Sequence, residues 1–285
     1  MNNEKIEIKK SKEIKLVISD GYFYTLNLTD YIKCNQKVIE LFNSYDIRAV
    51  NIWGTISDCG LEEIDKRIQY LHFIDKQAKI NLDKLYNFKN LLKIVWDYTQ
   101  NLKIDYSQFP LLEELHTTWN KHISYKAAHN LKFLFLRSYN SDVLIQDLPQ
   151  NIEILELHRG KLKNLHGIQS AKRVRWLEIQ YFPNLESLDG IDQLNDLKFI
   201  SLHNCGKKIN IEYLSNIESL EAIRLLGFNE IETLKPLQKL PNLKSLIVDS
   251  GCKILDGDKS LLNLKGDVSH LYNYKSINQR LYKEL

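Results

Sequence analysis

The side chains best suited to catalysis or metal binding are eight histidines and four cysteines, and their spacing matches no common reactive motif. Cys34, Cys59, Cys205 and Cys252 are far apart and form no C-x-x-C pair, so the sequence indicates neither a zinc ribbon nor a disulfide framework. It also lacks a Gly-rich phosphate loop, a G-x-S-x-G turn and an H-E-x-x-H segment. We therefore expect no catalytic residue, no metal and no cofactor.

Composition excludes several other classes of protein. The 285 residues are 44% hydrophobic and 26% charged, which is typical of a soluble globular protein. The 39 basic and 36 acidic residues are spread along the chain without a basic block, so we expect no direct binding to nucleic acid. The first residues are charged where a signal peptide would be apolar, and no later apolar run is as long as a membrane span. We therefore expect a cytoplasmic protein that does not bind membranes.

The elements that would position any site come from a repeat. The pattern apolar-x-x-apolar-x-apolar occurs ten times at intervals of 19 to 23 residues. The fourth residues of the ten matches are Val50, Leu71, Ile94, Leu115, Leu134, Leu155, Leu177, Ile200, Ile223 and Leu246. A constant period of this length predicts a solenoid in which each repeat supplies one short strand.

These segments resemble the leucine-rich-repeat family from about Ile47 to Asp249. Between strands, apolar residues recur at every third position, as at Ile191, Leu194 and Leu197, which is similar to internalins and phosphatase-regulator repeats. The resemblance implies an α/β solenoid with a parallel concave sheet and a convex side of short 3₁₀ or irregular segments.

The chain departs from the family after the strand, where asparagine is usual. Asn120 fits, but the equivalent positions elsewhere hold Thr99, Tyr139, Gly160, Phe182, Cys205, Phe228 and Gly251. We therefore expect irregular turns and a solenoid less regular than the family average.

Both ends of such an array must be capped. Residues 1–46 predict a hairpin around Asp20-Gly21 followed by a short helix, and residues 267–285 predict a last strand and a closing helix. We expect a single domain, 1–285, with about ten repeats in 47–266 between these caps.

The alternation within each strand predicts which side chains point out of the core. Five large apolar residues fall at outward positions of adjacent strands, which predicts an exposed patch on the concave face: Phe133, Phe135, Ile154, Trp176 and Phe199. Exposed aromatic patches usually mark interaction sites. The alternative is that a cap, a loop or a shifted register covers these rings.

Polar residues at neighbouring outward positions predict a rim for this patch: Arg137, Glu156, His158, Glu178, Gln180, His203 and Arg224. Glu156 and Glu178 lie one strand apart, so a basic group should complete the pair. Either a basic partner or one of the two arginines could supply it. His158 and His203 are two strands apart, roughly 10 Å, which is too far to share a proton or a metal ion.

The architecture predicts protein recognition by the concave face without catalysis. The chain resembles the leucine-rich-repeat immunity proteins of bacterial polymorphic-toxin and contact-dependent growth inhibition systems. That resemblance implies a monomer that occludes a cognate toxin, such as a basic nuclease domain, in a 1:1 complex. The alternative is a regulatory scaffold that binds an endogenous enzyme or assembly factor.

Overall fold

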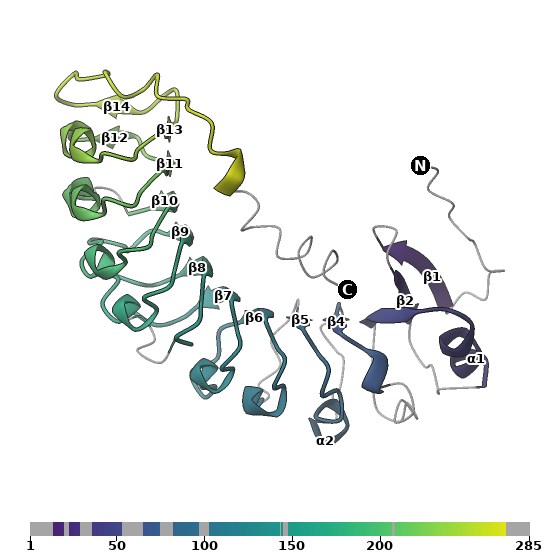
Figure 1. Ribbon diagram of the computed structural model, residues 1–285. Coiled ribbons are helices and arrows are strands. Elements are labelled where there is room, and N and C mark those ends of the chain that lie inside the picture. The colour runs from purple at the N-terminus through teal and green to yellow at the C-terminus, as the bar shows by residue number, and fades with distance from the viewer. Residues whose placement is uncertain are drawn as a thin grey trace. The chain divides into compact units, whose positions relative to one another are not determined.

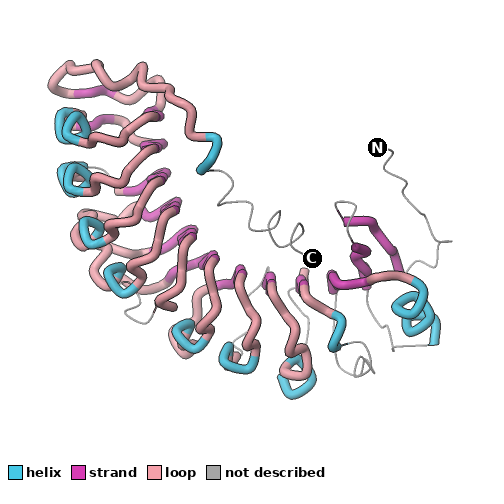
Figure 2. The backbone as a smooth tube through the Cα atoms, viewed as in Figure 1, coloured by secondary structure: helices cyan, strands magenta, loops and turns pink. Residues whose placement is uncertain are grey.

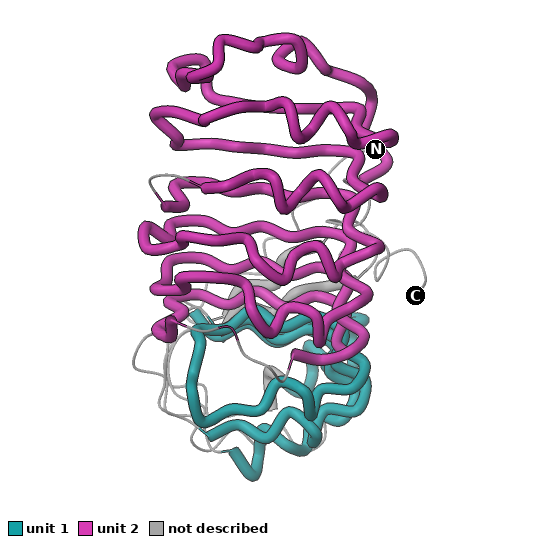
Figure 3. Tube along the Cα trace, turned by 90° about the vertical axis from the view of Figure 1, so that its left-hand side faces the viewer, with its two compact units in different colours: residues 1–130, 285 teal, residues 131–284 magenta. Residues whose placement is uncertain are grey.

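The computed structural model describes residues 14–19, 23–28, 36–52, 65–74, 82–96, 103–142, 144, 148–206 and 209–271. These fall into two compact units, Met1–Asn130 with Leu285 and Leu131–Glu284 (Figure 3). The predicted Asp20-Gly21 turn and most of the predicted C-terminal cap lie outside the described residues, so the single domain 1–285 stays a prediction.

Unit 1 combines an antiparallel hairpin with a run of parallel strands. Its elements are β1 (Ile14–Ser19), β2 (Phe23–Leu28), α1 (Gln36–Ser44), β3 (Ile47–Ile52), η2 (Asp65–Arg67), β4 (Tyr70–Phe73), α2 (Leu82–Leu85), β5 (Lys93–Trp96), η3 (Tyr106–Gln108), β6 (Glu114–Thr118) and η4 (Tyr125–Ala127), where η denotes a 3₁₀ helix. Strand β1 pairs with β2 in antiparallel fashion, and β2 to β6 follow one another in parallel. The hairpin and helix expected at the N-terminal end are therefore confirmed.

Unit 2 is a parallel sheet with short helices opposite the strands (Figures 1 and 2). Its elements are β7 (Phe133–Tyr139), β8 (Ile154–Gly160), η5 (Ile168–Ser170), β9 (Trp176–Phe182), η6 (Ile191–Gln193), β10 (Phe199–Cys205), η7 (Ile211–Asn216), β11 (Ala222–Leu226), β12 (Glu230–Ile231), η8 (Lys235–Lys239), β13 (Ser245–Val248) and β14 (Lys253–Ile254). Strands β7, β8, β9, β10, β11 and β13 pair in that order, and β12 pairs with β14.

The core follows the predicted register in both units. Within each unit, the fourth residues of successive repeats face one another across paired strands. All ten are at most 2% exposed. The three-residue apolar spacing also appears as predicted, since η6 begins at Ile191, and Ile191, Leu194 and Leu197 are fully buried.

The strand ends of unit 2 are regular, so the expected irregularity is wrong for β7 to β10. Each of these strands has seven residues, and the sixth adopts a left-handed backbone: Ser138 (φ 55°), Arg159 (φ 59°), Tyr181 (φ 60°) and Asn204 (φ 53°). This conformation is uncommon outside glycine. It turns the seventh residue toward the core, where Tyr139, Phe182 and Cys205 are fully buried.

Packing takes the place of an asparagine ladder at these ends. The Phe182 ring occupies the space beside Gly160, where an added Cβ would lie 2.2 Å from the ring. On the next strand, the Cys205 thiol donates to the carbonyl oxygen of Ile179 at 3.2 Å. Burial raises the pKa of this thiol to about 11, so Cys205 stays protonated and has a structural role.

Candidate functional site: the sheet face of unit 2

The large apolar residues of the predicted patch lie side by side, but they are not exposed. Phe133, Ile154, Trp176 and Phe199 face one another in register on β7 to β10. They are only 5%, 1%, 1% and 2% exposed, while Phe135 is half-buried. The prediction of an exposed apolar patch is therefore wrong, although the register on which it depended is correct.

Stacking across strands contributes to this burial. In-register parallel strands place equivalent side chains about 4.8 Å apart, which is close to the stacking distance of aromatic rings. The Trp176 and Phe199 ring centroids are 3.7 Å apart with an interplanar angle of 21°. Each ring thus covers a face of its neighbour, which strand alternation alone does not reveal.

The arginines expected at the rim lie over aromatic rings. The Arg137 Cζ is 5.6 Å from the centroid of the half-buried Phe135 ring, and the Arg224 Cζ is 5.7 Å from that of Phe199. Arg137 is exposed and Arg224 is half-buried. These are cation–π distances, so both guanidinium groups are held against the sheet.

Glu156 and Glu178 were also expected at the rim, and this is wrong because both are buried. They are 6% and 3% exposed and face each other in register on β8 and β9. Trp176 Nε1 donates to Glu178 Oε1 at 3.1 Å, and Gln180 Nε2 donates to Glu178 Oε2 at 3.2 Å. These two donors fix the orientation of the carboxylate.

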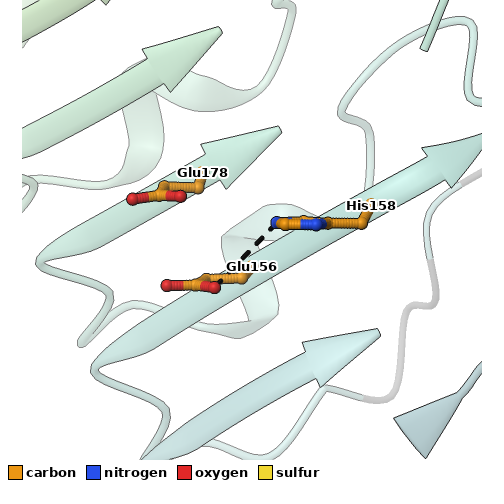
Figure 4. A group of neighbouring side chains, drawn as sticks. All are labelled: Glu156, His158 and Glu178. Atoms are coloured by element: carbon orange, nitrogen blue, oxygen red, sulfur yellow. Dashed lines mark ion pairs between the residues drawn. The ribbon is translucent and has the colours of Figure 1, made fainter. Parts of the chain in front are cut away.

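His158 completes a compact group with the two carboxylates, which we call the Glu-His-Glu cluster (Figure 4). One possible ligand atom from each of Glu156, His158 and Glu178 lies within 4.8 Å of the other two. His158 Nε2 is 4.0 Å from Glu156 Oε2, and the imidazole packs against Phe135 with ring centroids 4.6 Å apart. The sequence placed these residues on neighbouring strands but did not predict that they would form a buried group.

His158 and His203 are separated as predicted. His158 faces Gln180 on β9, and Gln180 faces His203 on β10, so the histidines are two strands apart. His203 packs instead against Tyr181, with ring centroids 5.2 Å apart.

Two exposed residues of this face were missed by the sequence prediction. Arg159 and Tyr181 occupy the left-handed positions of β8 and β9, and the Arg159 Cζ is 5.9 Å from the centroid of the Tyr181 ring. Tyr181 is 45% exposed. With His203 they form what we call the edge row: Arg159, Tyr181 and His203. The sequence carries no signal for them, because the left-handed backbone at Arg159 and Tyr181 is known only from the structure.

Other buried carboxylates are paired with lysine. In unit 1, Glu114 is 1% exposed and contacts Lys93 Nζ at 2.8 Å and His116 Nε2 at 2.5 Å. Burial alone would raise its pKa, but the hydrogen bond from His116 and the charge of Lys93 hold that pKa below its usual value.

In unit 2, Glu221 contacts Lys198 Nζ at 2.9 Å and Lys244 Nζ at 2.6 Å. Burial opposes ionisation here too, yet hydrogen bonds from the two lysines bring the pKa of Glu221 down to about 2. Both Glu114 and Glu221 therefore stay ionised at neutral pH.

Among the described residues, no helix is both long and apolar enough to cross a membrane. No protein-family model matches the sequence, and no curated protein matches it either.

Solved structures with a similar fold were found. The internalin inlF of Listeria monocytogenes aligns with a TM-score of 0.54 at 14% identity, covering 72% of this chain and 65% of the internalin. A chain of the Toll–Spätzle complex from Drosophila aligns with a TM-score of 0.51 at 13% identity, covering 82% of this chain and 35% of that one. The leucine-rich-repeat protein LIC12759 of Leptospira interrogans has 18% identity and a TM-score of 0.46, covering 81% and 72%.

This chain thus spans slightly less than two thirds of the internalin it matches. With the parallel strands and the repeating core, the comparison shows that the chain has the leucine-rich-repeat fold, an α/β solenoid. A leucine-rich-repeat fold suggests a protein-binding scaffold, which agrees with the sequence prediction.

Proposed function

We propose that this protein is a non-catalytic immunity protein that acts in the cytoplasm by binding and occluding a cognate bacterial toxin. The observation that carries the proposal is the edge row on β8, β9 and β10, where arginine, tyrosine and histidine side chains stack beside one another at the surface. Arginine and tyrosine are enriched among the residues that dominate binding energy at protein interfaces.

The edge row is prepared for binding because the structure below it is rigid. The strands beneath it are held in register, and the rings of Trp176 and Phe199 are closely stacked. A side chain that is already ordered loses less conformational entropy when a partner binds. A surface of this kind suits tight occlusion of another folded domain.

The exposed charges of this face change the type of partner that we propose. The two carboxylates that suggested a basic nuclease are buried, whereas Arg137 and Arg159 are exposed on β7 and β8. We therefore propose a toxin domain that presents carboxylates and aromatic rings to this edge, in a 1:1 complex. Complementary charges would mainly raise the association rate, and this contribution would weaken with salt.

Affinity purification of the tagged protein from its native host, grown with competing cells, tests the proposal. We expect a stoichiometric toxin domain identified by mass spectrometry, and inhibition of that toxin by the purified protein. Recovery of a resident host enzyme or assembly factor, with no protection against a delivered toxin, would favour a regulatory scaffold and overturn the immunity proposal.

The edge row is then tested with the recovered toxin. Arg159→Ala and Tyr181→Gly should each slow association or speed dissociation, with a loss of about 10-fold or more in affinity. Lys235→Ala is a matched control, because Lys235 is an exposed cation on η8, opposite the strands. Equal losses in the control and the edge variants would show that the toxin binds elsewhere.

A further inference from the structure

We propose that the Glu-His-Glu cluster binds one divalent transition-metal ion, with Zn²⁺ the best match to its ligands. The inference does not depend on the proposed function, because the three residues belong to one unit and their ligand atoms already converge. It also replaces the expectation from sequence that the protein has no metal site.

The backbone brings the ligands together. Glu156 and His158 are two residues apart on β8, so both side chains emerge from the same face of the sheet. Glu178 is the in-register partner of Glu156 on β9 and emerges from that face as well. The ligand atoms lie within 4.8 Å of one another, and ligands around one Zn²⁺ at about 2.0–2.2 Å would be about 3–4 Å apart. On binding, the ligand atoms would therefore move about 1 Å closer together.

The two carboxylates are largely shielded from water, at 6% and 3% exposed. Carboxylates in such a position are either paired or coordinate a metal ion.

A recurring tripeptide supports this argument. The sequence E-L-H occurs at residues 114–116 of β6 and again at 156–158 of β8. In β6, the residue that faces the glutamate in register is Lys93, which forms an ion pair with Glu114. In β8, Glu156 faces Phe135 on β7 and Glu178 on β9. The same tripeptide therefore forms part of a salt bridge in one unit and of a possible ligand set in the other.

Neighbouring side chains hold the ligands in place. Trp176 and Gln180 each donate to one oxygen of Glu178 and orient its carboxylate. Phe135 packs against the His158 imidazole and limits its rotation. Outer partners of this kind orient metal ligands, and their loss typically lowers metal affinity 10- to 100-fold.

The one imidazole nitrogen and two carboxylate oxygens favour a transition-metal ion over Mg²⁺ or Ca²⁺. Imidazole nitrogen suits Zn²⁺ and other transition metals, whereas Mg²⁺ and Ca²⁺ prefer oxygen ligands alone. One nitrogen and two carboxylate oxygens form a three-ligand Zn²⁺ site with a further coordination position available.

The test uses tag-free, full-length protein that has been dialysed against a chelator and then titrated with ZnCl₂. We expect isothermal titration calorimetry to give one site per chain, and elemental analysis after gel filtration to give one zinc per chain. Glu178→Gln and His158→Gln should each weaken binding about 100-fold or more, since each removes a ligand and the loss of an outer partner alone costs about 10- to 100-fold.

Two variants serve as matched controls. His203→Gln removes a half-buried histidine that lies two strands from His158, and Glu221→Gln removes a buried carboxylate that is paired with lysines. Both should bind zinc as the wild type does. Stoichiometry well below one in the wild type, or equal affinity in His158→Gln and the wild type, would overturn the proposal.

A measurement on the wild type guards against variants that fail to fold. Co²⁺ bound to one nitrogen and oxygen ligands should give visible absorption bands that saturate at one equivalent and disappear when Zn²⁺ is added. Cobalt absorption that does not saturate, or that Zn²⁺ does not displace, would indicate adventitious binding only and would contradict the proposed site.

Discussion

The two E-L-H tripeptides, one in each unit, have different partners because they begin at different positions of their strands: Glu114 is the first residue of β6, and Glu156 is the third residue of β8. Glu114 and Glu156 are both buried, and each precedes a half-buried histidine by two residues. Lys93 on the preceding strand faces Glu114, whereas Glu156 lies between Phe135 on the preceding strand and Glu178 on the following strand. In a parallel sheet, the character of a position is therefore set as much by the neighbouring repeat as by its own strand.

The largest effect is expected from Glu178→Lys. This change places a lysine opposite Glu156, as Lys93 stands opposite Glu114. We expect the new lysine to form an ion pair with Glu156, as Lys93 does with Glu114. Zinc binding should fall below detection in calorimetry, because one ligand is lost and a positive charge is added. Retention of wild-type zinc affinity would show that the cluster is not the site.

The reciprocal experiment is Glu114→Gln, which removes the carboxylate from the lysine-paired region. In the wild type, the pKa of Glu114 is held below the ordinary value of 4.5, so the ionised carboxylate stabilises the fold at neutral pH. That stabilisation is present above the ordinary pKa and is lost as the pH falls through the lower, folded-state pKa. The variant should lose about 3 kcal/mol of unfolding free energy at pH 7, because removing one partner breaks a largely buried ion pair.

Urea unfolding between pH 7 and pH 3 measures this effect. The difference between Glu114→Gln and the wild type should shrink as the pH falls. A constant difference across this range would show that ionisation of Glu114 contributes little to stability.

The smallest expected effect concerns the left-handed strand ends. Tyr181 on β9 and Gly227 after β11 both have positive φ, 60° and 74°. Tyr181→Gly should therefore be more stable than Tyr181→Ala by about 1 kcal/mol, because glycine adopts this backbone without strain. Urea midpoints of the two variants at pH 7 measure it. Equal stability would mean that the backbone at this position relaxes when the ring is removed.

Much of the fold could be predicted from sequence, because the same apolar pattern occurs in ten successive segments. An error in one repeat is corrected by the next, and the in-register residues from Val50 to Leu115 and from Leu134 to Leu246 were identified correctly. The candidate site was predicted less well. Its residues are neighbours as expected, but Trp176, Glu156 and Glu178 are buried rather than exposed.

The sequence by itself determined the architecture. Side chains alternate with a period of two within each strand, and the strands recur about every 22 residues. Only one register of neighbouring strands then buries every leucine. Only the tertiary structure decided exposure and chemistry. Whether Phe199 faces water depends on the Trp176 ring stacked against it, and whether a buried glutamate can be a metal ligand depends on which residue faces it. These properties depend on side-chain packing between strands that are about 22 residues apart in the chain. The alternation of apolar and polar residues within one strand does not show how those side chains pack.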